Sequence, residues 1–493
     1  MPIEQPEQPD IVELSRQAIA ALSSEREMLF VQGNRLVDVE FTDGKITVDK
    51  VSRQRLLYHM RRCLDWDQKQ LNLVASDLMQ HKKLGDFRRL EGTYTAPTFR
   101  PDFTLIPPGY DEGTGSLYVP PADLKDHRFN LKATQADARN AYERLLYPFS
   151  DFPFKSEADK INVVAFLLTL VCRTALDVVI PVLAVDANGQ SVGKTLLSKA
   201  ICHIAFGYEL SPFNVPSSKH EWEIRMDALT MSSEKIACLD NVNGRFSNDN
   251  FASLVTSRMR KVRALGKSTL YDVRNELAFI LNGNNIRLDT DTAQRVIWVN
   301  MWHPDPTSRN QNEFTIWRDH HTDLESYLAA NRVQYLDSVV TLILAWRNAG
   351  MPERQTVILN KYGDWERRIG GMLEFAGVDG FLANHAEKTE GADEEKQEVV
   401  RFLEAVRERF PTPGWAGGSG IVEAPISEIA GLMVPDGEWA GMLTAVNGFT
   451  KDRIAISLGK FVADHEGKPF GKYVMKKHKT NKGMALMVGE YRR

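Results

Sequence analysis

The sequence predicts an α/β protein with a mostly parallel central sheet, an α+β region before it, and a small domain of helices and a hairpin after it. From Val179 onward, short apolar strands alternate with helical stretches, which is typical of a parallel sheet covered by helices. The 493 residues exceed what one hydrophobic core organises, so about three domains are expected from length alone. The expected divisions are 1–150 (α+β region), 151–310 (sheet), 311–390 (helical region) and 391–493 (C-terminal domain).

Composition and charge exclude several classes of protein. With 61 Lys and Arg against 65 Asp and Glu, the net charge is −4, so any nucleic-acid contact must be confined to local basic patches. The four cysteines form no CxxC pair, which argues against a disulfide scaffold or a zinc ribbon and suits a reducing cytoplasm. The N-terminal MPIEQPEQPD is acidic and unlike a signal peptide. The apolar run 161–185 contains Arg173, Asp177 and Pro181, so we expect a buried helix and strand there and no membrane span.

Local patterns predict the individual elements. Helices are expected at 11–22, 53–64, 135–146, 158–175, 399–410, 426–433 and 451–463, with a helical region over 313–383. Strands are expected at 179–186, 235–240, 277–282 and 295–301, and hairpins at 103–120 and 473–489. The acidic stretch 387–398 indicates a solvated linker or the start of a helix.

The clearest chemical motif follows the first strand of the sheet. An apolar strand runs into a glycine-bearing turn and Gly193-Lys194-Thr195, and then into an amphipathic helix, which is the context of a phosphate-binding loop. In such a loop Lys194 neutralises phosphate charge and the Thr195 hydroxyl binds Mg²⁺, so ATP and Mg²⁺ are the expected cofactors. Asn188 stands where the motif has its first glycine, and we expect it to tolerate a left-handed turn there. The alternative is a chance strand–turn–helix. The expected nucleotide-binding residues are Asn188, Gly189, Gln190, Ser191, Val192, Gly193, Lys194, Thr195 and Leu196.

Four residues later in the sequence are candidates for the remaining parts of a nucleotide-hydrolysing site. Asp240 ends an apolar strand and is expected to hold Mg²⁺, while Asn241 can orient a water molecule but cannot take its proton. Asn284, after the next strand, is placed to contact the γ-phosphate, although Gly-Asn-Asn more often marks a turn. Arg295 can act as an arginine finger on the ATP of a neighbouring subunit, and otherwise is a surface arginine in a salt bridge.

These elements, in this order, resemble the ring-forming superfamily-three helicases of the AAA+ class, and most of all the primase-helicases of phages, prophages and integrated elements. The matching runs are DANGQSVGKTLLSKA, CLDNV, ASLVTSRMRKVRALGKS, FILNGNN and QRV, within about residues 180–310. Asn188, Asn241 and Gln294 depart from the family pattern. The resemblance implies a hexameric ring that hydrolyses ATP, moves single-stranded DNA through its channel, and replicates a mobile element in the cytoplasm of a bacterial host.

Two basic segments are the expected DNA contacts. Residues 258–274 carry six basic side chains against one acid and suit a hairpin, although a helix continuing from Phe251 is the alternative. Family rings place a hairpin there inside the channel, so Arg263 and Lys267 are the expected translocation contacts. Residues 451–493 carry 11 basic and four acidic residues, which predicts a winged-helix domain with Lys476 and Lys477 on its wing, binding duplex DNA. A basic protein-docking domain is the alternative.

Other functions remain open from the sequence. Asp65-Trp66-Asp67 has the DxD form of metal-binding polymerase sites, but we interpret it as surface charge in a helix, and expect the N-terminal region to form a collar or to dock a primase or another replication partner. One rival is an AAA+ ATPase that loads or remodels a protein partner without unwinding DNA. The other is a small-molecule kinase, which predicts a monomer with an acceptor pocket.

Overall fold

The chain divides into two compact units, Met1–His385 and Ala386–Arg493, in the computed structural model. The structure describes residues 10–23, 28–33, 35–42, 45–80, 87–216, 218–231, 234–246, 248–263, 270–288, 290–305, 313–410, 421–446, 448–481 and 483–490. Within these ranges, no helix combines the length and apolar character that a membrane span requires. The apolar run at 161–185 is instead divided between a helix and the first strand of the central sheet.

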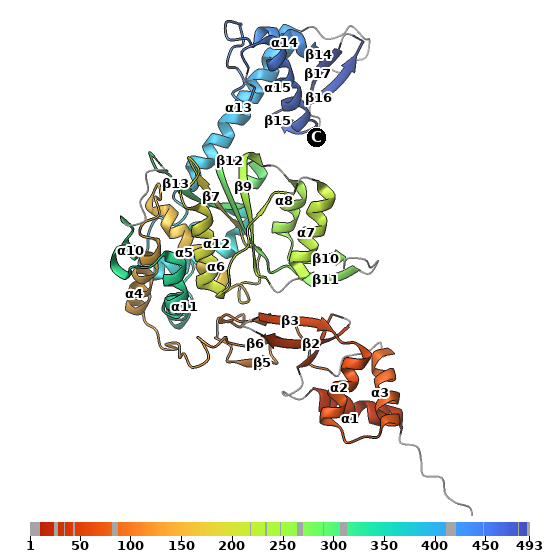
Figure 1. The fold of residues 1–493 in the computed structure, drawn as a ribbon. Coiled ribbons are helices and arrows are strands. Elements are labelled where there is room, and N and C mark those ends of the chain that lie inside the picture. Colours follow the sequence, from red (N-terminus) through yellow and green to blue (C-terminus); the bar gives the residue numbers. More distant parts are fainter. Residues whose placement is uncertain are drawn as a thin grey trace, which may run out of the picture. The chain divides into compact units, whose positions relative to one another are not determined.

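The first unit begins with a small three-stranded antiparallel sheet and three helices, drawn in red and orange in Figure 1. Helix α1 (Ile11–Leu22) begins at Asp10, whose carboxylate accepts a hydrogen bond from the Val12 amide. The three strands pair as two successive antiparallel hairpins, which the sequence-based expectations omitted. The other elements are β1 (Leu29–Gln32), β2 (Arg35–Thr42), β3 (Lys45–Lys50), α2 (Arg53–Cys63) and α3 (Gln68–Gln80). Asp65 and Asp67 lie in the connection between α2 and α3, so the expectation that they stand in a helix is wrong.

A second small sheet and two helices lead into the core. The expected hairpin at 103–120 is present but shorter, because Asp111 accepts hydrogen bonds from the amide and hydroxyl of Thr114 and so closes the turn between its strands. Capping boxes at Thr134 and Ser156 begin the two helices. These elements are β4 (Gly92–Tyr94), β5 (Gly109–Asp111), β6 (Ser116–Tyr118), α4 (Gln135–Leu146) and α5 (Glu157–Val171).

The centre of the first unit is a five-stranded sheet in the order β13-β7-β12-β9-β8, and each of its strand pairs is parallel. Two of its strands are longer than expected, since β9 and β12 each run for 11 residues and carry the chain well past Asp240 and Asn284. The bounds are β7 (Val182–Ala187), β8 (Phe213–Asn214), β9 (Ile236–Phe246), β12 (Ala278–Leu288) and β13 (Val296–Met301).

Helices cover both faces of this sheet, as Figure 1 shows. Alternate side chains of β7 enter different cores: Leu183 and Val185 pack with α5 and the helices on that side, whereas Val182 and Ala184 pack with Trp222 of α7. A strand that is buried on both faces reads as one continuous apolar run, which is why the sequence revealed it. The remaining elements of this layer are α6 (Lys194–Phe206), α7 (Lys219–Met231), α8 (Asp249–Thr256), α9 (Thr290–Ala293) and the antiparallel pair β10 (Met259–Arg263) and β11 (Leu270–Arg274).

The expected helical region after the sheet consists of α10 (Thr315–His320), α11 (Leu324–Asn348) and α12 (Gly363–Phe375). Most of α11 is buried, and its apolar side chains join the core formed by α5, α6 and one face of the sheet. This part of the chain therefore belongs to the same compact unit as the sheet rather than to a separate domain.

The second unit contains a four-stranded antiparallel sheet in the order β14-β17-β16-β15 and three helices around one core. The acidic stretch 387–398 is helical, within α13. Thr450 caps α15 by accepting a hydrogen bond from the Arg453 amide, as its position predicts. The elements are α13 (His385–Arg409), β14 (Val422–Pro425), α14 (Ile426–Leu432), α15 (Lys451–Asp464), β15 (Pro469–Phe470), β16 (Tyr473–Thr480) and β17 (Gly483–Glu490).

Candidate active site

The glycine-bearing loop joins the carboxyl end of β7 to the first turn of α6. Its left-handed residues are Ser191 (φ 60°) and Gly193 (φ 105°), and Gly193 forms the N-cap of the helix. Asn188 is not left-handed, so the reason expected for its tolerance in this loop is wrong. Its side-chain amide instead donates to the carbonyl of His303 at 2.8 Å and accepts from the amide of His303 at 3.2 Å. Asn188 thus ties the loop to the segment that follows β13.

Four of the expected site residues converge at the carboxyl edge of the sheet. The Lys194 ammonium donates to the Asn284 side-chain oxygen at 2.7 Å and to the Gly189 carbonyl at 2.9 Å. The Thr195 hydroxyl donates to Asp240 at 3.1 Å. This convergence follows from the strand order, because β12 lies between β7 and β9 and pairs Asn284 with Ala187, the last residue before the loop. Parallel strands end at one edge, where side chains from distant parts of the sequence meet.

The electrostatics of the loop favour an anionic ligand. Burial lowers the pKa of Lys194, and the negative charges of Asp240 and Asp186 partly oppose that shift. A half-buried ammonium whose hydrogen bonds go to neutral oxygens gains most from a ligand that brings negative charge. The amino end of α6 and the backbone N–H groups of the loop add partial positive charge at the same place. This edge of the sheet is therefore suited to phosphate groups.

A buried layer of polar side chains supports these residues. The Ser198 hydroxyl donates to the Asn282 side-chain oxygen at 2.9 Å, and Asn282 donates to the Cys238 sulfur at 3.3 Å, so that α6, β12 and β9 are joined beneath the loop. A Cβ atom on Gly283 would lie 1.8 Å from the Val242 carbonyl oxygen, so only glycine fits at this close approach of β12 to β9. Gly283 therefore belongs to an irregular strand, not to the turn that Gly-Asn-Asn commonly marks.

The residues present fit a magnesium ion. Thr195 and Asp240 offer a hydroxyl and a carboxylate oxygen, which are hard ligands of the kind Mg²⁺ takes when phosphates and water complete its octahedron. Over the described ranges, no group of three or more His, Cys, Asp or Glu side chains is placed to hold a metal ion.

Asn241 stands beside the carboxylate of Asp240 in a left-handed conformation, with φ 57°. Its side-chain amide donates to the Asn214 side-chain oxygen on β8, at 3.0 Å. An amide held in this way can orient a water molecule but cannot accept its proton. The position that follows Asp240 is therefore polar and held by a hydrogen bond, and it carries no basic group.

A cavity of about 560 Å³ opens beside the loop. Its wall includes Ser191, Gly193 and Leu196, so it adjoins the glycine-bearing loop and the first turn of α6 directly. The rest of the wall is largely apolar and comes from residues that precede and follow the central sheet in the sequence. Sequence reasoning did not connect these residues with the site. These residues are Pro148, Asp151, Phe152, Phe314, Ile316, Trp317, Thr322, Asp323, Leu324 and Glu325. A volume of this size, apolar with a few polar groups at its rim, is typical of a small-molecule site.

Arg295 does not join this group. It precedes β13, where its carbonyl accepts from the Val182 amide at the start of β7, and it is therefore separated from the loop by the length of the strand, about 20 Å for six residues. Its guanidinium donates to the Ala252 carbonyl of α8 at 2.5 Å. Arg295 thus cannot reach a nucleotide bound to its own chain.

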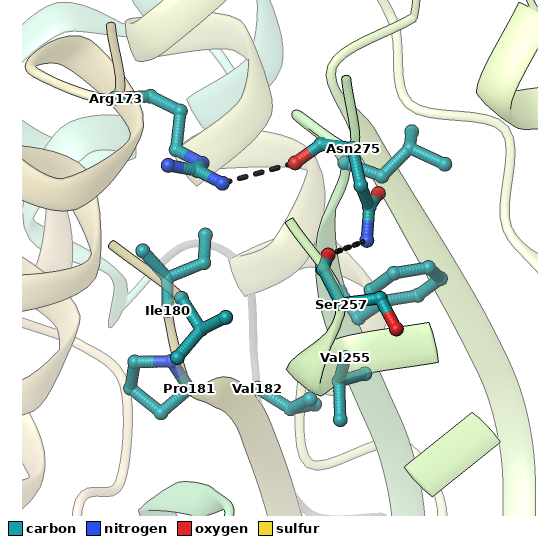
Figure 2. A pocket seen from close by; sticks show the side chains of 10 residues that line it. Arg173, Ile180, Pro181, Val182, Val255, Ser257 and Asn275 are labelled. Atoms are coloured by element: carbon teal, nitrogen blue, oxygen red, sulfur yellow. Dashed lines mark hydrogen bonds between the residues drawn. The ribbon is translucent and has the colours of Figure 1, made fainter. Parts of the chain in front are cut away.

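The basic segment 258–274 forms the antiparallel pair β10 and β11, not a continued helix. Lys267 lies outside the described residues, and Arg263 is described by its backbone alone, as the last residue of β10. Figure 2 shows how the base of this hairpin is held, around a small pocket. The Asn275 amide donates to the Arg258 carbonyl at 2.8 Å and its side chain donates to the Ser257 carbonyl at 3.0 Å. The partly buried Arg173 donates to the Asn275 carbonyl at 3.0 Å.

An ion pair next to Asn275 extends this anchor. The Glu276 carboxylate accepts from Lys235 at 2.8 Å and from the Tyr94 hydroxyl at 2.9 Å. Burial acts to raise the pKa of Glu276, but the charge and hydrogen bond of Lys235 outweigh it and the pKa lies below its ordinary value. Lys235 directly precedes β9, the strand of Asp240, and Tyr94 belongs to β4. The hairpin base is thus joined both to the start of β9 and to the N-terminal region.

In the second unit, Lys476 and Lys477 lie on β16, as expected for the hairpin. The side chain of Lys476 is exposed. The Lys477 ammonium donates to the Gly459 carbonyl of α15 at 3.2 Å, so it is directed toward that helix.

Comparison with known proteins gives structural likenesses at low identity. No family model and no curated protein matches the sequence. Among solved structures, the chain is similar to the C-terminal region of NrS-1 in its apo A form, with 10% identity, a TM-score of 0.42, and coverage of 94% of this chain and 96% of that one. It is also similar to SCCmec type IV Cch, described as an active helicase, with 10% identity, a TM-score of 0.36, and coverage of 92% and 90%. The JCV helicase covers 52% of this chain at 13% identity and a TM-score of 0.23, with 74% of that chain covered.

Proposed function

We propose that this chain is an ATP-dependent, ring-forming DNA helicase or translocase that serves the replication of a phage or another mobile element. The observation that carries the proposal is the convergence of Lys194, Thr195, Asp240 and Asn284 at one edge of a parallel sheet. An ammonium, a hydroxyl beside a carboxylate, and an amide next to the ammonium are the groups that bind and hydrolyse Mg-ATP.

The site residues have distinct roles in this proposal. The loop amides and the amino end of α6 hold the phosphates, and Lys194 exchanges its bonds to Gly189 and Asn284 for β- and γ-phosphate oxygens. Thr195 and Asp240 hold Mg²⁺, which neutralises charge on the β- and γ-phosphates. Asn284, once released by Lys194, is free to contact the γ-phosphate and the attacking water. The apolar cavity beside Leu196 takes the base and ribose.

Hydrolysis in this proposal depends on positioning more than on a strong base. Phosphoryl transfer draws most of its rate from alignment and from neutralised charge, so Asn241 contributes by orienting the water. Arg295, which lies far from the nucleotide of its own subunit, acts in trans across the ring, and its bond to Ala252 opens when a neighbour docks.

The basic segments contact DNA in this proposal. The β10–β11 hairpin, with Arg263 and Lys267, follows the phosphates of a single strand in the channel of a hexamer, since a ring of cations attracts the backbone. The second unit has the succession of helix, strand, two helices and hairpin that a winged-helix domain requires, and we assign duplex binding to α15 and to Lys476 and Lys477. The N-terminal region is the expected dock for a primase or another replication partner.

The test measures ATP hydrolysis with and without single-stranded DNA, and strand displacement on forked DNA. Lys194→Ala is expected to abolish both activities, whereas Lys267→Ala is expected to keep basal hydrolysis and lose DNA stimulation and unwinding. Lys160→Ala is the matched control, because Lys160 lies on α5 in a surface pair with Glu157. Hydrolysis by Lys194→Ala at the wild-type rate would refute the site. If single-stranded DNA does not change the rate of ATP hydrolysis by the wild-type protein, the result would favour an ATPase that remodels a protein partner.

A further inference from the structure

Helix α2 in the N-terminal region is strongly basic. Its sequence, RQRLLYHMRRC, holds four arginines, one histidine and no acid. Leu56, Leu57, His59 and Met60 are buried, which fixes the rotation of the helix. The opposite side carries exposed residues at positions i, i+4, i+7 and i+8, which lie on one helical stripe. This Tyr58 stripe consists of Gln54, Tyr58, Arg61 and Arg62.

A buried carboxylate sets the position of the aromatic ring in this stripe. Asp38 on β2 is only 5% exposed and accepts from Arg55 Nε at 2.5 Å, and His59 Nε2 lies 3.1 Å from the same oxygen. The Arg55 guanidinium, which also pairs with Glu40, stands 5.1 Å from the centroid of the Tyr58 ring. Tyr58 is therefore held by a fixed neighbour, although 47% of it remains exposed to solvent.

Several arginines of α2 lie close to the Tyr58 ring. Arg61 donates to the neutral side chain of Gln68, and Arg53 donates to the neutral side chain of Asn72, so these bonds orient the guanidiniums without cancelling their charge. The Arg62 guanidinium lies 5.6 Å from the Tyr58 centroid. The helix thus presents an exposed aromatic ring together with cations within two turns.

We propose that the Tyr58 stripe is a binding site for single-stranded DNA, separate from the β10–β11 hairpin and from the second unit. A nucleotide carries an aromatic base and an anionic phosphate within one residue, and the stripe offers a partner for each: the Tyr58 ring for stacking, and Arg61 and Arg62 for phosphates. A duplex keeps its bases stacked on one another and gives the ring nothing to bind. An acidic peptide would satisfy the arginines but leave the ring exposed. The proposal does not depend on ATP hydrolysis.

The experiment uses the full chain, without nucleotide, and an oligothymidylate of about ten nucleotides that carries 5-iodouracil, a length within the range one such site covers. Long-wavelength ultraviolet light joins the iodinated base to an aromatic ring that stacks on it, and mass spectrometry maps the joined residue. We expect a crosslink at Tyr58 in the wild type and at the same position in Tyr58→Phe, which keeps an aromatic ring. In Tyr58→Ala, the affinity of this site for the oligonucleotide should fall by about 5- to 100-fold. Leu73→Ala is the matched control, since Leu73 is 48% exposed on the neighbouring α3.

The arginines are tested by salt dependence. Removing two phosphate contacts in the double variant Arg61→Ala and Arg62→Ala should reduce the slope of log affinity against log salt by about 1.4. Arg16→Ala, in a surface pair with Glu13 on α1, should leave the slope unchanged. A wild-type crosslink map without Tyr58 would overturn the proposal. The proposal would also be overturned if a duplex of the same sequence, at the same concentration, competed with the single strand for this site. An unchanged slope of log affinity against log salt in the double variant would overturn it as well.

Discussion

Replacing Glu276 by Gln tests whether the base of the β10–β11 hairpin is held by charge. The carboxylate side chain is 11% exposed and its partner Lys235 is 22% exposed, so the pair is largely shielded from water. Breaking a buried pair costs about 3–5 kcal/mol. Glutamine keeps an acceptor for the Tyr94 hydroxyl and Lys235 regains part of its hydration, so we expect a smaller loss of about 2–3 kcal/mol.

That loss should appear locally, in the exchange of backbone amides with deuterated water. If the free energy of local opening falls by about 2–3 kcal/mol, amide exchange in β10 and β11 becomes about 30- to 150-fold faster, while exchange in β7 stays unchanged. Glu157→Gln is the control, because its pair with Lys160 is exposed and contributes at most about 0.5 kcal/mol. In ATPase assays, Glu276→Gln should keep basal hydrolysis and lose DNA stimulation, since the residues proposed for hydrolysis are unchanged.

The dependence on pH has a definite sign. The pKa of Glu276 is lowered in the folded chain, so its stabilisation is present above the ordinary value of 4.5 and is lost as pH falls through the lowered value. Burial raises the pKa of Tyr94 well above its ordinary value of 10.0, so the phenol remains a hydrogen-bond donor throughout this range. Exchange rates in β10 and β11 that match those of the Glu157→Gln control at neutral pH would refute this account of the hairpin.

Two further substitutions address the proposed nucleotide site. Asn188→Gly restores the usual glycine of the loop but removes both hydrogen bonds to His303. We therefore expect the KM for ATP, measured by steady-state titration, to rise about 3- to 10-fold. A lower KM would mean that the hydrogen bonds between Asn188 and His303 do not support nucleotide binding. Arg295→Ala should be inactive alone but should regain hydrolysis when mixed with Lys194→Ala subunits, because each variant supplies what the other lacks. Absence of recovery, with a lowered Tm for Arg295→Ala, would indicate that the bond to Ala252 is purely structural.

The sequence was a good guide to the sheet and to the residues that meet at its edge. Strands such as β7 are buried on both faces and therefore appear as uninterrupted apolar runs, and a parallel arrangement brings their carboxyl ends together without any knowledge of distant contacts. This is why Lys194, Thr195, Asp240 and Asn284 could be named as one group before their distances were known. The short strands β1 to β3 gave a weaker pattern, because apolar and polar residues mixed over four to eight positions also fit a loop.

The parts that sequence reasoning missed are contacts between residues far apart in the chain. Tyr94 and Glu276 are 182 positions apart, and neither has a local motif that would indicate a partner. Arg173 likewise interrupts an apolar run, which by itself shows only that the run does not cross a membrane. Its hydrogen bond to the Asn275 carbonyl joins the segment after α5 to the segment between β11 and β12, and the packing of the whole unit brings these two segments together (Figure 2). A buried cation in an apolar run is costly without a partner. Such a residue is therefore itself a signal that a distant carbonyl or carboxylate lies against it, even where the sequence cannot say which one.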